Sequence, residues 1–328
     1  MKKLRCGLLG AGYQGRTHAK KLAGHPMAEW VAVADINPAA AEAALEFAPG
    51  ARVYTDGFSM IKDAGLDALY VAIPPCGHTG EVEAAAAKGI HLLLEKPLAL
   101  DSARASAMVE AVEKAGVTSQ VGFHMRFLKS VQAMKKMLVD GSAGRPLLFS
   151  SRYWVNMEGN EWWRRRDGSG GQVVEQIIHM YDLALHWMGR PEAVNGVASK
   201  LTRQAAADYT IEDTSVGLLR FPGGALATLT GSNCAVHMHF IGDFQMVCEN
   251  ATFVYTNSGQ HWVTPDKALI YNPDGTVRHA FTEDGDPYRL ETDDFLSAIR
   301  EGRPALTPAR HGLEAMLVTE KVRDGNVI

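Results

Sequence analysis

Short apolar runs alternate with helix-forming segments between residues 4 and 123. We predict strands at 4–9, 30–35, 67–75, 90–97 and 117–123. We predict helices between them at 16–24, 38–48, 78–89 and 102–116. Strands that are apolar on both faces and joined by helices form a parallel sheet that is covered on both sides. The pattern therefore predicts an α/β domain with a parallel sheet, which we assign to residues 1–122.

The pattern changes after Gly122, where the alternation of strands and helices stops. We predict helices at 129–141, 170–189, 289–300 and 310–323. We predict extended runs at 145–156, 192–201, 214–221, 225–233, 244–250, 251–257 and 267–272. Pro222-Gly223-Gly224 separates two of these runs, which is typical of a β-hairpin. We therefore expect a second α/β domain at 123–328 with a mostly antiparallel sheet.

The first predicted turn carries a glycine motif. Gly10-x-Gly12-x-x-Gly15 follows a strand and opens a helix, and an acid, Asp35, ends the next strand. Together these features are the fingerprint of a dinucleotide site, because the glycines permit a tight turn and let the pyrophosphate approach the helix N-terminus. A glycine turn without a ligand is the alternative. The residues that we predict to contact the cofactor here are Gly10, Ala11, Gly12, Tyr13, Gln14, Gly15, Asp35 and Ile36.

Asp35 also bears on the choice of dinucleotide. A carboxylate at this place accepts hydrogen bonds from both ribose hydroxyls of NAD and repels the 2′-phosphate of NADP. Ile36 and Asn37, which follow it, supply no cation to offset that repulsion. We therefore predict NAD rather than NADP, with an Arg52 that folds back toward the ribose as the open alternative.

Two further strand ends, 72–78 and 93–98, carry polar side chains. Ligands of open parallel sheets lie beyond the carboxyl ends of the strands. Lys96 stands at such an end, where it could hydrogen-bond a reacting hydroxyl and stabilise negative charge on oxygen. The alternative is an ordinary surface lysine, which is the commonest environment of that residue. The residues of these two ends that we assign to the cofactor site are Ala72, Pro74, His78, Glu95 and Lys96.

The helix predicted at 170–189 carries two acids and a histidine at helical spacing. Glu175, His179 and Asp182 are four and three residues apart and so share one face. On pattern alone, a solvated helix face is favoured over an active site. Paired glycines ahead of the helix favour a ligand instead, because they permit its close approach.

Across almost the whole chain the motifs resemble the glucose–fructose oxidoreductase, inositol dehydrogenase and rhizopine-catabolism (Gfo/Idh/MocA) family of oxidoreductases. The segments that carry the resemblance are GLLGAGYQGRTHAKKL with His18, VAVADINP, VAIPPCGH, LLLEKPLAL, VGFHMRF and GSGGQVVEQIIHMYDLALHWMG. The resemblance implies a Rossmann domain followed by an α/β domain with a large, mostly antiparallel open sheet. It also implies NAD(P)-dependent oxidation of a secondary alcohol or hemiacetal on a sugar or polyol. The open face of the sheet usually makes the subunit contact in that family, which implies a homodimer or homotetramer.

The resemblance also implies roles for individual residues. His179 matches the histidine that takes the proton from the substrate hydroxyl, and Lys96 matches the lysine that supports it. An imidazole with an unperturbed pKa of about 6.5 suits a base that is neutral near pH 7, and a nearby lysine lowers that pKa. Asp182 either holds the imidazole ring or pairs with a residue in the core. We count Lys96, His179, Asp182 and Glu175 as the candidate catalytic residues.

This chain departs from the family pattern at two places. Glu175 stands where these dehydrogenases usually have aspartate, and Met125 stands where many have a second arginine ahead of Arg126. The substrate therefore does not follow from the resemblance. Tryptophans in the 153–171 segment could stack on a sugar, or could belong to the core. The residues that we predict to contact the substrate are Lys96, His124, Arg126, Trp154, Trp163, Glu175 and His179.

Composition narrows the classes of protein. The formal net charge is −4, and the densest positive run, Arg164-Arg165-Arg166, is too short for a nucleic-acid surface. Four cysteines form no CxxC pair, which indicates a reducing compartment and argues against structural zinc. The apolar run at the amino terminus is too short for a signal peptide or a membrane span. We expect a cytoplasmic enzyme that binds a small molecule and has no metal, nucleic-acid or membrane partner.

Three functions compete at this stage. The leading hypothesis is an NAD-dependent sugar or polyol dehydrogenase. The second is a glycoside hydrolase that uses NAD to oxidise the sugar transiently and then returns the hydride. The third is a non-catalytic NAD-binding regulator, against which the presence of both Lys96 and His179 weighs.

Overall fold

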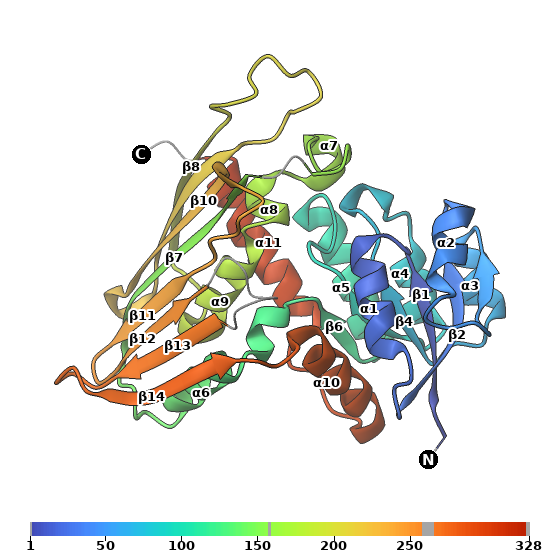
Figure 1. Ribbon diagram of the computed structural model, residues 1–328, viewed down its shortest axis with the longest axis horizontal. Helices are drawn as coiled ribbons and strands as arrows, with labels where there is room; N and C mark the ends of the chain where they lie inside the picture. Colours follow the sequence, from blue (N-terminus) through green and yellow to red (C-terminus); the bar gives the residue numbers. More distant parts are fainter. Residues whose placement is uncertain (1, 157–158, 258–265, 326–328) are drawn as a thin grey trace. The chain divides into compact units, whose positions relative to one another are not determined.

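The computed structural model describes residues 2–156, 159–257 and 266–325. By its internal contacts the chain divides into two compact units. The first unit comprises Met1–His124 and Asp286–Glu314, and the second comprises Met125–Gly285 and Ala315–Ile328. The colours of Figure 1 show this division along the chain, because orange-red helix α10 belongs with the blue and cyan elements of the first unit.

The first unit is built on a six-stranded sheet in the order β3-β2-β1-β4-β5-β6, in which every neighbouring pair is parallel. Its strands are β1 (Leu4–Leu9), β2 (Ala28–Ala34), β3 (Arg52–Tyr54), β4 (Ala68–Val71), β5 (His91–Leu94) and β6 (Ser119–Val121). Its helices are α1 (Tyr13–Leu22), α2 (Pro38–Ala44), α3 (Gly57–Asp63), α4 (Glu81–Ala87), α5 (Ser102–Ala115) and α10 (Pro287–Glu301), with the short 3₁₀ turn η1 (Pro75–Gly77). A second 3₁₀ turn, η2 (His124–Phe127), begins at the last residue before the chain enters the second unit. The predicted parallel α/β domain is confirmed.

Local sequence explains most of these helices. The side chains of Asn37, Asp56 and Asp101 accept hydrogen bonds from the first turns of α2, α3 and α5, so each helix begins where its cap stands. Gly116 ends α5 in the left-handed conformation at φ +66°. The sequence analysis did not predict β3 or α3. The strand has only three residues, too few to show an apolar period, and the helix is only seven residues long.

Helix α10 returns from the far end of the sequence to pack on α1. Lys21 pairs with Asp286, and His25 Nε2 lies 2.8 Å from Asp293 Oδ1. The sequence analysis divides the chain once, between residues 122 and 123. The first crossing in the structure lies two residues later, and the return of 286–314 was not anticipated, because no local pattern marks which sheet a late helix covers.

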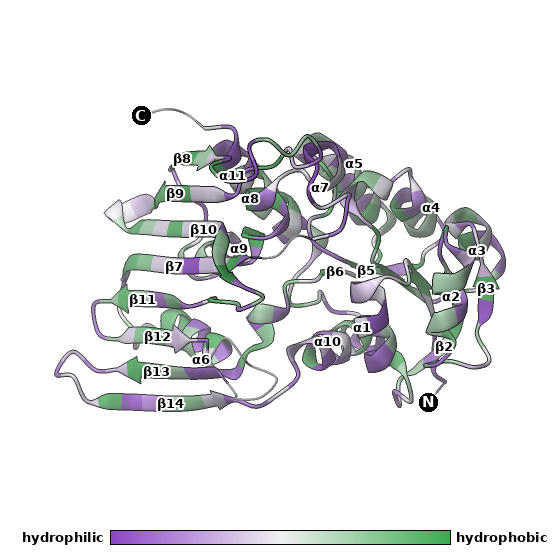
Figure 2. Ribbon diagram, turned by 45° about the horizontal axis from the view of Figure 1, so that its top comes forward, coloured by the Kyte–Doolittle hydropathy of each residue, from purple (hydrophilic) through white to green (hydrophobic). Residues whose placement is uncertain are grey.

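The second unit is built on an eight-stranded sheet in the order β14-β13-β12-β11-β7-β10-β9-β8. Figure 2 shows these strands side by side. The strands are β7 (Pro146–Asn156), β8 (Ala193–Ser199), β9 (Thr214–Arg220), β10 (Leu226–His237), β11 (Phe244–Cys248), β12 (Thr252–Thr256), β13 (Asp266–Tyr271) and β14 (Val277–Glu283). Every pair is antiparallel except β10 with β7. The predicted large, mostly antiparallel sheet and the hairpin at Pro222-Gly223-Gly224 (η3) are confirmed, whereas β14 was not predicted.

The helices of this unit accompany the sheet. They are α6 (Lys129–Val139), α7 (Arg166–Ser169), α8 (Gln172–Glu175), α9 (Ile178–Met188) and α11 (Ala309–Arg323), whose first residues fall in the first unit. Of these, α6 and α9 pack on the strands of the sheet. Phe149, Trp187, Phe244 and Phe253 form an aromatic cluster in the core between α9 and the strands. Strand β9 alternates buried and exposed residues, so the other face of the sheet carries exposed apolar side chains.

The helix predicted at 170–189 is two helices. α8 ends at Glu175 and α9 begins at Ile178. At the break, the N–H of Ile177 donates to the carbonyl of Gln172, five residues back, and the N–H of Met180 donates to Ile177, three residues back. This change of hydrogen-bond register is a π-type bulge, a feature that residue periodicity does not reveal. Among the described residues, no helix is long and apolar enough to cross a membrane.

Candidate active site

The glycine turn between β1 and α1 has a conformation that only glycine allows. Gly10 has φ +89°, and a Cβ on it would lie 2.4 Å from the carbonyl oxygen of Ala72. A Cβ on Gly15 would lie 1.9 Å from the carbonyl oxygen of Gly10, so the helix packs directly on the turn. Gly12, at the start of α1, has nothing within 4 Å of its would-be Cβ. This open space over a helix N-terminus fits the pyrophosphate of a dinucleotide.

Asp35 is held in place by backbone amides. Its Oδ2 accepts a hydrogen bond from Ala11 N at 2.7 Å, and its Oδ1 accepts one from Asn37 N at 2.8 Å. Tyr13, in the glycine turn, and Ile36, which follows Asp35, are 85% and 94% exposed. Arg52 lies with its guanidinium carbon 4.7 Å from the centre of the Tyr54 ring. The carboxylate is thus fixed at the edge of the glycine turn, as the fingerprint requires of the group that contacts the ribose.

In the loop after β4, both the backbone and the His78 side chain make hydrogen bonds within the first unit. The N–H of Ala72 donates to Leu9 at 2.8 Å, and Pro74 precedes the short turn η1. His78 Nδ1 bonds the carboxylate of Glu81, which also accepts from the backbone of Thr79 at 2.8 Å. Burial raises the pKa of Glu81, but the hydrogen bond and charge of His78 outweigh it and lower the pKa to about 2. The His78 ring therefore contributes to the start of α4.

The residue before Lys96 is the centre of a buried polar cluster. Glu95 Oε1 lies 2.7 Å from His18 Nε2 and accepts from Gln14 Nε2 at 3.3 Å. Its other oxygen accepts from the backbone N–H of Lys96 at 3.2 Å. Burial raises the pKa of Glu95, but the hydrogen bond and charge of His18 and the charges of Lys96 and His124 outweigh burial. The pKa of Glu95 is therefore lowered. Glu95 thus ties the main chain of Lys96 to the helix that carries the glycine motif.

Tyr288 completes this cluster from α10. Its hydroxyl lies 3.4 Å from Gln14 Nε2, and its ring stacks on His124 with centroids 4.5 Å apart and planes at 18°. The predicted substrate residue His124 therefore sits beside the glycine motif within the first unit. The sequence analysis missed Tyr288, because nothing in residues 286–290 indicates that α10 returns to α1.

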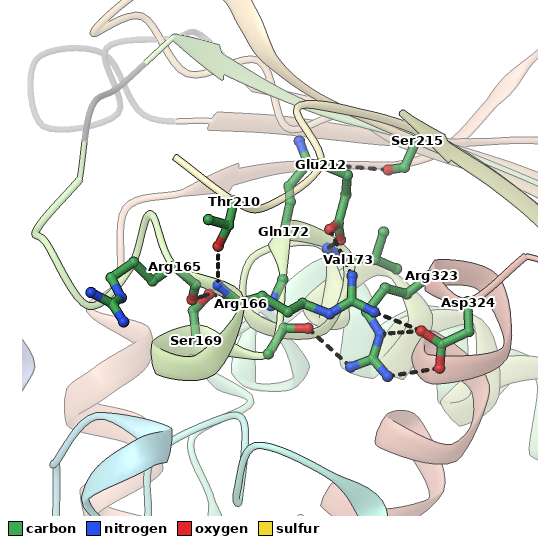
Figure 3. A network of polar contacts seen from close by, with 12 residues as sticks. Arg165, Arg166, Ser169, Gln172, Val173, Thr210, Glu212, Ser215, Arg323 and Asp324 are labelled. Carbon is green, nitrogen blue, oxygen red and sulfur yellow. Dashed lines mark hydrogen bonds and ion pairs between the residues drawn. The ribbon is translucent and has the colours of Figure 1, made fainter. Parts of the chain in front are cut away.

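In the second unit, a polar network fixes the start of α8 (Figure 3). Glu212 accepts a hydrogen bond from Val173 N at 2.9 Å, and Arg323 Nη1 donates to the carbonyl of Gly170 at 2.9 Å. Gly171 has φ +110°, and a Cβ there would lie 2.8 Å from the Glu212 carboxylate oxygens. The paired glycines that the sequence analysis noted thus allow the Glu212 carboxylate to approach the N-terminus of α8 closely.

Glu175 and His179 lie beside an aromatic residue that the sequence analysis did not single out. Tyr153 on β7 stacks on the His179 ring, with centroids 6.4 Å apart and planes at 20°. Burial raises the pKa of Tyr153, and the negative charge of Glu175 raises it further. Glu175 Oε2 accepts a hydrogen bond from Trp163 Nε1 at 2.6 Å. His179 is only 4% exposed, which argues against the alternative of a solvated helix face.

Asp182 pairs with Arg126. The Nε of Arg126 donates to Asp182 Oδ2 at 2.7 Å, and Nη2 donates to the other oxygen, which makes the ion pair bidentate. The two residues are 1% and 3% exposed. Asp182 thus pairs with a residue in the core, which is one of the two alternatives given for it. Arg126, predicted to contact substrate, is engaged in this ion pair.

The predicted sugar-stacking tryptophans have different environments. Trp154 on β7 is half-buried, donates to Thr230 Oγ1 at 3.0 Å and lies under the guanidinium of Arg152. Trp163 is buried in a small apolar cluster with Tyr209 and Ile211. No group of three or more potential metal ligands occurs among the described residues.

Comparisons with known proteins cover both units. Residues 4–123 match the family model described as oxidoreductase family, NAD-binding Rossmann fold, and residues 131–254 match the model of the GFO/IDH/MocA C-terminal domain. The chain is 30% identical over 326 residues to inositol 2-dehydrogenase of Rhizobium meliloti (strain 1021), a match that covers 97% of this chain and 95% of that protein. It is 28% identical over 323 residues to scyllo-inositol 2-dehydrogenase (NAD(+)) of Bacillus subtilis (strain 168), covering 97% and 92% of the two chains.

A solved structure of levoglucosan dehydrogenase in complex with NADH and levoglucosan is also similar. The TM-score is 0.87 at 22% identity, and the match covers 98% of this chain and 97% of that one. At this identity the similarity shows a shared fold.

Proposed function

The chain belongs to the Gfo/Idh/MocA oxidoreductase family, whose first domain is an NAD-binding Rossmann fold, and on that premise we propose that it is an NAD-dependent dehydrogenase of a sugar or polyol. The reacting group is a secondary alcohol or a hemiacetal carbon. NAD, when bound, supplies the hydride acceptor. The glycine turn with Gly10, Gly12 and Gly15 holds its pyrophosphate, and Asp35 accepts hydrogen bonds from its ribose.

The observation that carries the proposal is the buried imidazole of His179, stacked on Tyr153 beside the Glu175 carboxylate. We assign His179 the role of the base that accepts the proton of the substrate hydroxyl. A neutral imidazole is the usual side chain for this task near pH 7. We assign Lys96 the role of stabilising, by its charge, the alkoxide that develops on the substrate. Asp182 supports α9 through Arg126 instead of touching the substrate.

The substrate class follows from the relatives together with the polar side chains of the second unit. The two curated relatives described above are named for inositols, and the structural relative for levoglucosan. Glu175 offers an acceptor for substrate hydroxyls, and Trp154 offers a ring face to a carbohydrate.

A screen of inositols, sugars and glycosides with NAD and NADP tests the proposal. We expect reduction of NAD, followed by absorbance, with at least one polyol or sugar and a weaker response with NADP. Release of the aglycone from a chromogenic glycoside without net formation of NADH would instead favour the redox-assisted hydrolase. Binding of NAD without turnover of any compound would favour the non-catalytic regulator.

We also propose that a second copy of the chain covers the exposed sheet face of the second unit. Val197, Val216, Leu218 and Leu226 on β8, β9 and β10 are each more than 40% exposed. Exposed apolar patches of this kind mark association surfaces. Sedimentation of the purified protein tests this, and a dimer or tetramer that dissociates when Val216 and Leu218 become lysine is the expected result. A monomeric parent protein would rule it out.

A further inference from the structure

Trp163 and Glu175 are joined by a hydrogen bond between their side chains. The indole N–H donates to Glu175 Oε2 at 2.6 Å. Tryptophan has only this one polar group, and it can only donate, so the bond fixes the direction of the acceptor. A hydrogen bond to an ionised carboxylate is also among the stronger ones in proteins.

The indole itself is locked in place. Trp163 is 5% exposed and packs with Tyr209 and Ile211. Gly159, at φ +65°, lies so close to the ring that a Cβ on it would be 2.3 Å from the ring atom Cε3. Tyr209 is held in turn by Asn233 Nδ2, which donates to its hydroxyl at 3.2 Å. Because the ring is enclosed in this way, its faces serve packing and do not present a stacking platform for a sugar.

The carboxylate that Trp163 holds lies where the proposed chemistry takes place. Glu175 ends α8, a helix of four residues whose other end is held by Glu212. Its charge acts on Tyr153, which stacks on the His179 ring. The indole N–H bonds one oxygen of this carboxylate and so favours the side-chain rotamer that the structure shows.

We propose that Trp163 is a positioning residue, which fixes the Glu175 carboxylate beside Tyr153 and His179 and thereby sets which substrate hydroxyl pattern is accepted. This inference rests on the proposed function for its substrate. The longer side chain of glutamate is part of the arrangement, because aspartate at this place would withdraw the carboxylate from the indole by about the length of one C–C bond. A site built to hydrogen-bond particular hydroxyls discriminates strongly against isomers that leave its polar groups unpaired.

The first test observes the bond without any turnover. The whole protein is labelled with ¹⁵N at the tryptophan indoles and saturated with NAD, and Trp163→Phe identifies the Trp163 resonance. We expect Glu175→Ala and Glu175→Asp to move that resonance toward values of weaker hydrogen bonds. Trp162→Phe is the matched control, because Trp162 is partly buried against the same cluster, and it should leave the resonance in place. If no indole resonance moves in either Glu175 variant, the proposal is overturned, even where Trp163→Phe fails to fold.

The second test is a double-mutant cycle on kcat/KM, measured with two epimeric polyols found in the screen. Trp163→Phe should lower kcat/KM by ~10-fold and change the ratio between the epimers. In the Glu175→Ala background the same change should cost less than ~2-fold, because the group that it positions is gone. Equal losses in both backgrounds would contradict a positioning role. A screen that finds no oxidised alcohol rejects the proposed function, whereas an unmoved indole resonance rejects this inference.

Discussion

The two units hold their site carboxylates in different ways. In the first unit, Asp35 accepts from the backbone amides of Ala11 and Asn37. In the second unit, Glu175 is held by the indole of Trp163, twelve residues away, and Asp182 by the guanidinium of Arg126, 56 residues away. The first arrangement follows largely from main-chain geometry, and the second from side chains that the fold brings together. A substitution therefore acts on a local turn in one unit and on a network in the other.

The largest effect that we expect is a loss of turnover when one residue of either unit, Lys96 or His179, is replaced. Lys96→Ala and His179→Ala should each lower turnover by at least ~100-fold, because each removes a group that handles charge or a proton at the reacting oxygen. Binding of NAD, measured by calorimetry, should persist in both variants, since neither residue forms the glycine turn. Near-normal turnover in either variant would show that its assigned role is wrong.

The difference between the units also explains what could be predicted from the sequence. The glycine motif, Asp35 and the strand ends are contiguous segments, and the NAD-binding Rossmann fold and the family that they indicated are confirmed. The glycines were assigned a tight turn, which the would-be Cβ contacts of Gly10 and Gly15 bear out. In this unit, residues that are close in the sequence form the turn, so their spacing predicts its geometry.

The second unit shows what the sequence could not supply. The break at Gln176-Ile177 depends on hydrogen bonds that shift register, and the period of apolar residues runs through it unchanged. The partners Tyr153, Trp163 and Arg126 come from other elements and were either missed or given another role. Tyr288 of the first unit was missed for the same reason, because α10 returns from the far end of the chain.

A second prediction breaks the network of the second unit. Asp182→Ala leaves the Arg126 guanidinium buried without its partner, and removal of one member of a buried ion pair costs about 3 kcal/mol or more. Urea unfolding should show this loss. The matched control is Glu113→Ala, which removes the partner of Arg310 from an ion pair that is 46% and 48% exposed. That variant should lose less than about 1 kcal/mol. Equal losses would mean that burial does not distinguish the two pairs.

A third prediction tests the backbone geometry of the first unit. Gly15→Ala places a methyl group 1.9 Å from the carbonyl oxygen of Gly10, and the resulting displacement should cost about 2 kcal/mol of unfolding free energy. Gly12→Ala is its control, because the space around Gly12 is open. It should fold with nearly normal stability and bind NAD more weakly, since its methyl group occupies the pyrophosphate cradle. Normal NAD affinity in Gly12→Ala would place the dinucleotide elsewhere.

The smallest expected effect is a pH dependence within the first unit, where two buried carboxyls have opposite shifts. Hydrogen bonding and charge from His78 outweigh burial and lower the pKa of Glu81 to about 2, from a usual 4.5. The stability that Glu81 contributes is therefore present above pH 4.5 and is lost as the pH falls toward 2. Burial, reinforced by the charge of Glu95, raises the pKa of Glu291 well above 4.5. Its contribution has the opposite sign, since it is present below pH 4.5 and is lost as the pH rises.

Unfolding measured from pH 3 to pH 8 separates these two carboxyls. Glu81→Gln should be less stable than the parent near pH 7, and the gap should narrow toward pH 3, because the unfolded parent then binds a proton that the folded carboxylate, with its pKa of about 2, does not. Glu291→Gln should be more stable than the parent near pH 7, since the amide has no proton to give up and so avoids the cost of a buried charge. A Glu291→Gln variant that is less stable at every pH would mean that this carboxyl is held by hydrogen bonds, as the other site carboxylates are. The contrast between the units would then rest on Asp35 alone.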